Sequence, residues 1–557
     1  MKVNKQESDN IANLNYFPHL SKEVIKNIKK FQLDSFLIAY EGWRRGLTLK
    51  WYQDESNECE LSRLNSSTSG KFYSLTSPDR KHYFFRSRGD QVQNKTVRLC
   101  QNKEKTKEIL KNGNVAIPQG EEFNISEEYE ILKFAEEIGY PLVVKPVSGS
   151  MGRGVFINLK NETELTNILK HYKNNLPYKK VIVEKHHQGK EYRIYVVGNE
   201  AVSVINRIPA NIIGDGVSTV KELISLKNKQ RKKNPYLAAK PIKIDYEINQ
   251  KLANQNLNEN SILEKDQKIF LRELSNLSTG GEPIDETNQI TQEVKQIAVD
   301  ALKVMPSIPH AGVDVIIDPK NDKKAVVLEI NATAEIAFHL FPLNNKPVDL
   351  PAKIIDYYFP ETINNPTTNF YFDYKSILEP LKTSSTELVK VTPAPIGKLY
   401  RKIYYVEGKL SNVGYLSWIK RQALMRDLHG SIKKINKNKV KIDVIGTDKA
   451  VVEEFINICK KGSKKSQVED ISSINKNINE EDIFKLGFEI KYNKKRKKKN
   501  NNMKSKKNIE SNYKAIKNQI EAENLQLKKE LKDIKASKSW KITKPLRFFN
   551  KGSNKFK

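Results

Sequence analysis

The chain has 557 residues, with 97 lysines and arginines against 66 aspartates and glutamates, which gives a formal net charge of +31. Three widely separated cysteines and no CxxC pair argue against a zinc site and a disulfide framework, and no apolar run reaches the roughly 18 residues of a membrane-spanning helix. The length allows roughly two to four domains, and the charge favours anionic partners, although a lysine-rich background with one basic tail explains it more simply.

Hydrophobic patterning predicts an α/β core in the first two thirds of the chain. Residues 1–95 are expected to form a mixed α/β region. The stretch EYEILKFAEEIGYPLVVKPV (128–147) changes from a helical period to a buried strand at GYP, and residues 181–210 predict successive strands. A helix at 288–305 then precedes two apolar strands, AGVDVIID and KAVVLEIN. This order predicts an α+β or α/β domain that ends near residue 360.

The remaining sequence predicts a small domain between two linkers, followed by a tail. The loops NNPTTN and TPAPIG indicate a linker at 361–396, and residues 397–475 show a compact pattern of strands and helices. Residues 476–510 include KYNKKRKKKNNNMKSKK, with ten basic residues and no acids, and are expected to be a disordered linker.

Residues 511–557 predict a charged, coiled-coil-like helix with a basic and aromatic end. Its apolar stripe consists of Ile516, Ile520, Leu527, Leu531 and Ile534. Three interpretations stay open: the helix forms a homodimer, the aromatic end contacts an anionic membrane surface, or the segment is a solvated tail.

A glycine-rich segment, VVKPVSGSMGRGVFINL (143–159), is the first sign of a chemical site. Backbone amides in such a turn can converge on phosphate oxygens, and Lys145 can add a positive charge at the end of an apolar strand. Because glycine-rich turns are common, this segment alone is a weak signal for phosphate binding.

A second group of polar residues suits a nucleoside. Glu184 and Lys185 end one strand, and Glu191 opens the next one. Backbone groups at a strand end can bind an adenine edge, and a carboxylate one turn later can bind the ribose hydroxyls. Taken alone, an exposed charged hairpin is the simpler interpretation.

A third group suits a metal ion. Asp314, Glu329 and Asn331 lie at or near the ends of facing strands. Two carboxylates and an amide oxygen are hard ligands of the kind that Mg²⁺ prefers beside substrate phosphates. A solvated sheet edge is the alternative, but the apolar residues that flank both acids argue against it.

In order along the chain, these motifs resemble those of ATP-grasp ligases. The segments NRIPANIIGDGVSTVKELI (206–224) and LRELSNLSTGG (271–281) are similar to the ATP-grasp domains of cyanophycin synthetases and bifunctional glutathione synthetases. The resemblance covers residues 95–345 and places an ATP-grasp domain at 96–360. It implies an α+β fold, ATP as cosubstrate, and Mg²⁺ or Mn²⁺.

The resemblance also implies a role for each matching residue. The phosphates of ATP would contact Lys107 and Lys145 from opposite sides. The flexible lid over them would consist of Gly149, Ser150, Met151, Gly152, Arg153 and Gly154. The adenine would contact Glu184 and Lys185, the ribose Glu191, and the metal Asp314, Glu329 and Asn331. The arginines that face the phosphates and the acyl group would be Arg193 and Arg207, with Asn211 following in the same motif.

The family implies ligation of a carboxylate to an amine through an acylphosphate, so amino-acid or peptide-like substrates are expected. One departure concerns the segment after the metal-binding asparagine. Where cyanophycin-type enzymes run through Pro-Gly to an arginine, this chain has Ala334, Glu335 and Ala337. The ATP-binding half therefore matches the family, and the half that receives the acceptor differs from it.

Residues 404–462 resemble acylphosphatase, which has a small ferredoxin-like α/β sandwich fold. Leu416 stands where that family has its phosphate-binding arginine, and Lys434 where it has the asparagine that orients water. The resemblance therefore implies an acylphosphatase-like domain without hydrolytic activity, which either docks an acidic polymer or serves the fold.

Two hypotheses remain for the whole chain. The first is an ATP-dependent carboxylate–amine ligase of bacterial cell-envelope or peptide-polymer synthesis, in the cytoplasm or at the inner face of the membrane. The second is a nucleotide-binding pseudoenzyme that recruits envelope machinery through its tail. Nucleic-acid binding would rest on charge alone, because no basic motif is interleaved with aromatic residues.

Overall fold

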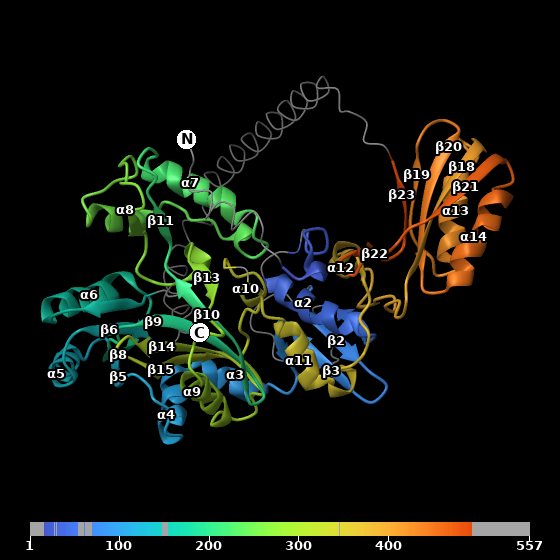
Figure 1. Cartoon of the computed structure of the whole chain (residues 1–557). Helices are drawn as coiled ribbons and strands as arrows, with labels where there is room; N and C mark the ends of the chain where they lie inside the picture. Colours follow the sequence, from blue (N-terminus) through green and yellow to red (C-terminus); the bar gives the residue numbers. More distant parts are fainter. Residues whose placement is uncertain are drawn as a thin grey trace, which may run out of the picture. The chain divides into compact units, whose positions relative to one another are not determined.

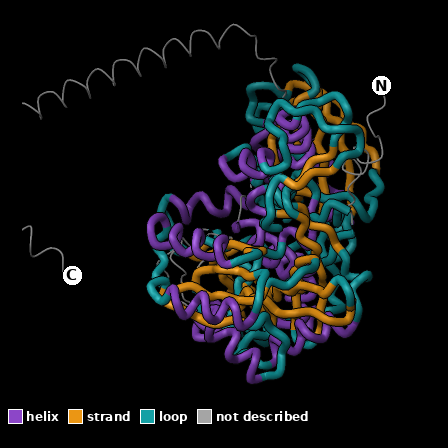
Figure 2. The backbone as a smooth tube through the Cα atoms, turned by 90° about the vertical axis from the view of Figure 1, so that its left-hand side faces the viewer, coloured by secondary structure: helices purple, strands orange, loops and turns teal. Residues whose placement is uncertain are grey.

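The computed structural model describes residues 16–26, 28, 31–53, 61, 70–147, 154–344 and 346–492. The described residues up to Ile490 form one compact unit, in which helices and strands alternate as the sequence predicts (Figures 1 and 2). The α+β class is therefore confirmed. Most of the glycine-rich lid and the predicted C-terminal helix lie outside the described residues. None of the described helices is long and apolar enough to cross a membrane.

The N-terminal region is built on an antiparallel sheet with strand order β17-β1-β2-β3-β4. Its strands are β17 (Leu388–Lys390), β1 (Thr48–Tyr52), β2 (Phe72–Thr76), β3 (Lys81–Phe85) and β4 (Arg88–Gly89). Helices pack beside it: α2 (Phe31–Arg44), α10 (Ala337–Leu340), α11 (Leu350–Tyr358) and α12 (Tyr374–Lys382), with the 3-10 turns η1 (Pro18–Leu20) and η4 (Pro360–Thr362). Segments from both sides of the ATP-grasp region thus share one hydrophobic core.

Residues 361–396 are folded into this N-terminal region, so the prediction of a linker there was wrong. Strand β17 pairs with β1, and α12 buries Leu378 and Leu381. The indole of Trp43 also donates a 2.7 Å hydrogen bond to the carbonyl of Thr392. The proline- and asparagine-rich ends of the segment resemble linker edges, but its apolar residues find their partners hundreds of positions earlier in the chain.

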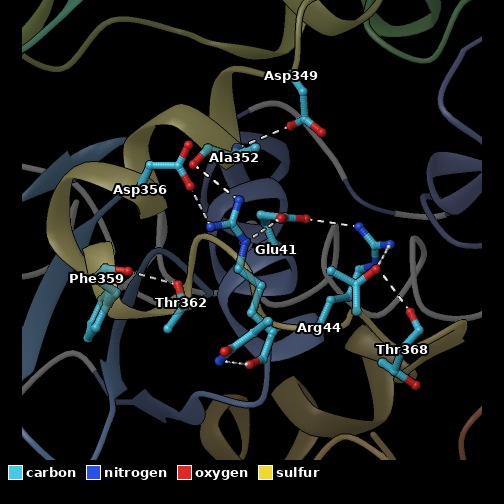
Figure 3. A network of polar contacts seen from close by, with 11 residues as sticks. Glu41, Arg44, Asp349, Ala352, Asp356, Phe359, Thr362 and Thr368 are labelled. Atoms are coloured by element: carbon cyan, nitrogen blue, oxygen red, sulfur yellow. Dashed lines mark hydrogen bonds and ion pairs between the residues drawn. The ribbon is translucent and has the colours of Figure 1, made fainter. Parts of the chain in front are cut away.

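Buried ion pairs and hydrogen bonds connect α2 to α11 and to Thr368 of the segment 361–396 (Figure 3). Arg44 and Arg45 both contact Glu41, at 2.9 Å and 2.8 Å. Arg45 also reaches the carboxylate of Asp356 on α11 at 2.6 Å, and Arg44 donates to the carbonyl of Thr368. Because charged groups this deeply buried need partners, the network fixes α11 and the following turn against α2.

Two sheets form the ATP-grasp region. The first has strand order β5-β8-β6-β7 and the second β13-β10-β9-β14-β15. The first consists of β5 (Gly120–Asn124), β8 (Lys180–Lys185), β6 (Leu142–Pro146) and β7 (Phe156–Leu159), packed with α5 (Glu128–Ile138) and α6 (Glu162–Asn175). The second consists of β13 (Glu282–Asp285), β10 (Glu200–Ile208), β9 (Lys190–Val197), β14 (His310–Asp318) and β15 (Asn321–Asn331), packed with α3 (Asn94–Gln101), α4 (Lys103–Asn112) and α9 (Gln292–Lys303).

A smaller lobe is inserted between β10 and β13 and has its own apolar core. It consists of β11 (Asn211–Ile213), α7 (Val220–Arg231), η2 (Leu237–Ala239), α8 (Tyr246–Ala253), β12 (Lys268–Phe270) and η3 (Leu277–Thr279). This lobe contributes Asn211, Tyr236, Lys240 and Ser275, which recur below.

The C-terminal domain is a five-stranded sheet with order β21-β18-β20-β19-β23 and two helices. Its elements are β18 (Tyr400–Lys409), α13 (Tyr415–Leu424), β19 (His429–Lys434), β20 (Lys439–Gly446), α14 (Lys449–Lys461), β21 (Gln467–Asn475), β22 (Phe484–Lys485) and β23 (Phe488–Lys491). The expected ferredoxin-like sandwich is therefore present, and it is joined to the ATP-grasp region in one chain.

This domain extends beyond the predicted boundary at residue 475. Strand β22 pairs in parallel with β16 (Phe370–Tyr371), and Phe488 of β23 is buried in the sandwich core. The prediction of disorder from residue 476 was therefore wrong for its first part, because isolated aromatic residues in a lysine-rich segment find buried partners. Residues 493–510 lie outside the described residues.

Candidate active site

A buried ion cluster lies where the sequence predicts phosphate binding. Lys107 of α4 and Lys145 of β6 both contact the carboxylate of Glu184 on β8, one at each oxygen. The side chains of all three are at most 10% exposed. The structure therefore brings the two lysines together and places Glu184 between them, as their counterion.

The electrostatics of this cluster follow from its burial. Burial lowers the pKa of Lys107, although Glu184 acts in the opposite direction. For Glu184, burial favours the neutral acid, but Lys145 and Lys107 together lower its pKa. Two lysines thus share one buried carboxylate, which leaves an excess of positive charge suited to a phosphate chain.

Lys103 is a member of this site that the sequence interpretation missed. Burial lowers its pKa, while Glu329 opposes that effect and Lys145 adds to it. It begins α4, one helical turn before Lys107, and the i, i+4 spacing was the signal available in the sequence. Lys103 is within electrostatic range of both the lysine cluster and Glu329 on β15.

A second cluster joins two arginines to the acids of the facing strands. Arg193 of β9 binds Asp314 of β14 through two nitrogens, at 2.5 Å and 2.6 Å. Arg207 of β10 contacts the same carboxylate at 2.9 Å and also contacts Glu191. Burial alone would raise the pKa of Asp314, but the two arginines more than offset this and lower it to about 2. The carboxylate of Asp314 is therefore ionised at neutral pH.

The residues expected to bind a metal ion lie side by side on β14 and β15. Asp314 and Glu329 are paired across the two strands, and the amide of Asn331 donates a 2.9 Å hydrogen bond to Glu329. Both oxygens of Asp314 contact arginines, whereas the side chain of Glu329 is 36% exposed. Within the described part of the chain, Asn331 Oδ1 has no hydrogen-bond donor. These oxygens fit a hard divalent ion in type, with Glu329 and Asn331 the most accessible.

The remaining predicted residues are distributed around these clusters. Lys185 donates hydrogen bonds to the carbonyls of Gly139 and Tyr140, at 3.0 Å and 3.1 Å. Asn211 donates a hydrogen bond to Glu282 of β13 and accepts one from Lys227 of the inserted lobe, each at 3.0 Å. Of the lid, Gly154 has a positive φ of 70° and its carbonyl accepts from Tyr172. The lid residues Gly149, Ser150, Met151, Gly152 and Arg153 lie outside the described residues.

The loop SNLSTGG contributes a direct contact, because Ser275 donates its hydroxyl proton to Glu191. Glu191 is thus held by Arg207 on one side and by Ser275 on the other. The carboxylate that the sequence predicts for the ribose therefore joins the inserted lobe to the arginine cluster.

In the C-terminal domain, the loop between β18 and α13 contains Gly414 at a φ of 77°. The hydroxyl of Ser411 in this loop donates to the carbonyl of Lys437, so the loop lies beside the turn that follows Lys434. Leu416 is half-buried against the core of the sandwich. The structure therefore places Leu416 and Lys434 at the same end of the domain.

Comparisons with protein families agree with both domains. Residues 100–222 match the model of the RimK-like ATP-grasp domain, and residues 402–490 match that of acylphosphatase. The chain therefore carries an ATP-grasp domain followed by an acylphosphatase-like domain.

Similar curated proteins include a cyanophycin synthetase of Crocosphaera subtropica, 32% identical over 47% of this chain and 31% of its own length. The glutathione biosynthesis bifunctional protein GshAB of Clostridium perfringens is 30% identical over 62% of this chain and 45% of its own length. A crystal structure of a bifunctional glutathione synthetase from Pasteurella multocida is 27% identical, with a TM-score of 0.44, over 59% of this chain and 44% of that one. The chain thus spans less than half the length of these relatives.

Proposed function

We propose that this chain, in which an ATP-grasp domain precedes an acylphosphatase-like domain, is an ATP-dependent ligase that joins a carboxylate to an amine. The observation that carries the proposal is the pairing of two clusters in one site. Three lysines around Glu184 suit a phosphate chain, and one of them, Lys103, is within electrostatic range of Glu329, which is paired with Asp314 across β14 and β15.

In the proposed reaction, Lys107 and Lys145 bind the phosphates of ATP and exchange part of their contact with Glu184 for phosphate oxygens. The substrate carboxylate attacks the γ-phosphorus, and ADP leaves. The product of this step is an acylphosphate, whose carbonyl carbon is then attacked by the amine. Phosphate leaves as the amide bond forms.

Arg193 and Arg207 are assigned to the transferring phosphoryl group and the acyl oxygen. Both are already held by Asp314, so their positions are fixed before substrate arrives. Preorganised positive charge of this kind is usually a large contribution to catalysis, because it needs no rearrangement in the transition state. Asn211 is assigned to the substrate side of the same region.

Mg²⁺, or Mn²⁺, would be held by Asp314, Glu329 and Asn331 and would supply further neutralisation of phosphate charge. Glu191 is assigned to the ribose, and Glu184 with Lys185 to the adenine side of the site. The substrates are proposed to be amino acids or peptide-like molecules of bacterial cell-envelope or peptide-polymer synthesis in the cytoplasm. Dimer formation and contact with an anionic membrane remain proposals for the tail.

Phosphate release from ATP and Mg²⁺ tests the proposal, with pools of amino acids and acidic peptides as substrates and mass spectrometry of the products. Release that requires one acid and one amine, with a product mass equal to their amide, is expected. ATP binding without release under every pool would favour the alternative, a nucleotide-binding scaffold that recruits envelope machinery.

The acylphosphatase-like domain is proposed to be inactive in hydrolysis, since Leu416 and Lys434 replace the arginine and asparagine of the family. The natural chain is expected to hydrolyse benzoyl phosphate no faster than buffer. The double variant Leu416→Arg, Lys434→Asn is expected to gain hydrolysis above that background, because it restores a phosphate ligand and a group that orients water. Hydrolysis by the natural chain at the rate of the double variant would contradict this assignment.

A further inference from the structure

The segment that follows β15 places a carboxylate beside the arginine cluster. A Cβ atom built on Gly312 of β14 would lie 2.9 Å from the Cβ of Ala334 and 3.0 Å from the Cδ of Arg193. Residue 334 therefore packs next to Arg193, and Glu335 follows it directly. Burial lowers the pKa of Arg193, but its acidic neighbours, Glu335 among them, raise it overall. Glu335 is thus within electrostatic range of the groups assigned to the acyl phosphate.

The segment is held rigidly by the N-terminal region. Asp34 of α2 accepts hydrogen bonds from the backbone amides of Ile336 and Ala337, at 2.9 Å and 3.2 Å. The hydroxyl of Ser87 donates to the carbonyl of Ala334 at 2.5 Å. These contacts fix the backbone on both sides of Glu335, so its carboxylate has a defined position.

Among the described residues, hydrogen-bond donors contact one of the two carboxylate oxygens of Glu335. Oε2 accepts from the hydroxyl of Tyr236 and from Nζ of Lys240, the latter at 2.7 Å. No hydrogen-bond donor among the described residues contacts Oε1, and the side chain is 24% exposed. The ammonium of Lys240 also lies 3.7 Å from the centre of the Tyr236 ring. Within the described part of the chain, the partly exposed carboxylate therefore has one oxygen without a hydrogen-bond donor.

Glu335 is also held in its charged form. Burial would raise its pKa, but Lys240, Tyr236 and Arg86 together lower it. A fixed, ionised carboxylate with one oxygen that no described donor contacts is suited to a group that is positively charged and donates hydrogen bonds. The two neighbouring acids, Glu335 and Asp34, are matched by Lys240 and Arg86, and a cluster without excess negative charge favours a singly charged ammonium over a divalent metal ion.

We propose that Oε1 of Glu335 binds the ammonium form of the amine acceptor and so determines which nucleophile reaches the acylphosphate. This assignment rests on the proposed ligase function and names its acceptor class, a primary ammonium. As the nitrogen attacks, the C–N bond forms and the bond between the acyl carbon and the phosphate oxygen breaks. The bound ammonium first loses one proton to solvent, which frees the lone pair for the attack, and the second proton goes to the departing phosphate.

The test distinguishes formation of the acylphosphate from its reaction with the amine, by comparing an uncharged nucleophile with one that arrives as an ammonium. Hydroxylamine is uncharged near neutral pH and converts an acylphosphate into a hydroxamate, so its reaction does not require an ammonium site. The full-length chain is incubated with ATP, Mg²⁺ and pools of the twenty common amino acids and of acidic peptides, with or without hydroxylamine. Hydroxamate is measured as its ferric complex, and amide products by mass spectrometry.

The variant Glu335→Gln is expected to lose much less hydroxamate formation than amide formation. Its KM for the amine that the natural chain accepts from the pools is expected to rise about ten- to a hundredfold, the usual effect of losing a charged hydrogen bond. Glu335→Asp should recover part of the loss. Glu407→Gln is the matched control, because Glu407 is a half-buried acid that contacts Lys439 at 2.6 Å in the other domain.

Three results would overturn the assignment. An unchanged KM for the amine in Glu335→Gln would show that Glu335 does not bind the acceptor. An equal fall of hydroxamate and amide formation would show a general structural role. Absence of both products with the natural chain would reject the proposed ligase function, and this assignment with it, whereas the first two results would leave that function standing.

Discussion

Replacing Glu329 with glutamine is expected to lower the rate of ATP turnover at least about a hundredfold, the scale of effect seen when one preorganised charge contact is lost. Glutamine has the same shape but no charge, so it weakens the metal site without creating a cavity. The side chain is 36% exposed and its ion pair with Arg193 is long, at 3.8 Å, so little stability should be lost. Phosphate release and the unfolding temperature are the two measurements.

Glu293→Gln serves as the control, because Glu293 is an exposed acid of the same domain that contacts Lys323. Its turnover should match that of the natural chain. Normal turnover in the Glu329 variant would show that the metal site has been assigned to the wrong strands. Loss of both turnover and folding would instead point to a structural role for Glu329.

Replacing Glu184 with glutamine is expected to destabilise the first ATP-grasp sheet by about 3 to 5 kcal/mol, the usual cost of leaving buried charges without their partner. Lys107 and Lys145 would then lie together without a counterion. Hydrogen exchange of the β6 and β8 amides measures this local stability, which suits a chain with several domains. Saturating Mg-ATP should recover part of the loss, because its phosphates supply negative charge to the same lysines.

The matched control for Glu184 is Glu122→Gln on β5, since Glu122 contacts Lys180, whose side chain is 61% exposed. Water can solvate that lysine after the change, so a much smaller effect on exchange is expected. Equal protection losses in the two variants, or no recovery with Mg-ATP, would argue that Lys107 and Lys145 do not bind phosphate.

Much of the fold was determined by sequence patterns alone. The switch of hydrophobic period at Gly139–Pro141 predicts helix and strand where the structure has α5 and β6. The motif order from Lys107 to Asn331 predicts the ATP-grasp domain, and the pattern from Tyr404 predicts the sandwich. The helix and strand could be predicted because burial of regular elements imposes a period on the sequence that is visible locally, whereas the two domains were predicted from resemblance to known families.

Other features were decided only by the tertiary structure. Residues 361–396 are part of the N-terminal region because β17 pairs with β1 and Thr392 contacts Trp43. No local sequence pattern encodes partners that are so far apart in the chain. Likewise, the sequence shows that residue 184 is a glutamate, but not that Lys107 and Lys145 both contact its carboxylate. Glu335 shows the same limit, because its contacts with Tyr236 and Lys240 join two distant segments that meet only in the folded chain. Sequence determines which groups are present and on which elements, whereas long-range packing decides which charges become neighbours and how far each is removed from water.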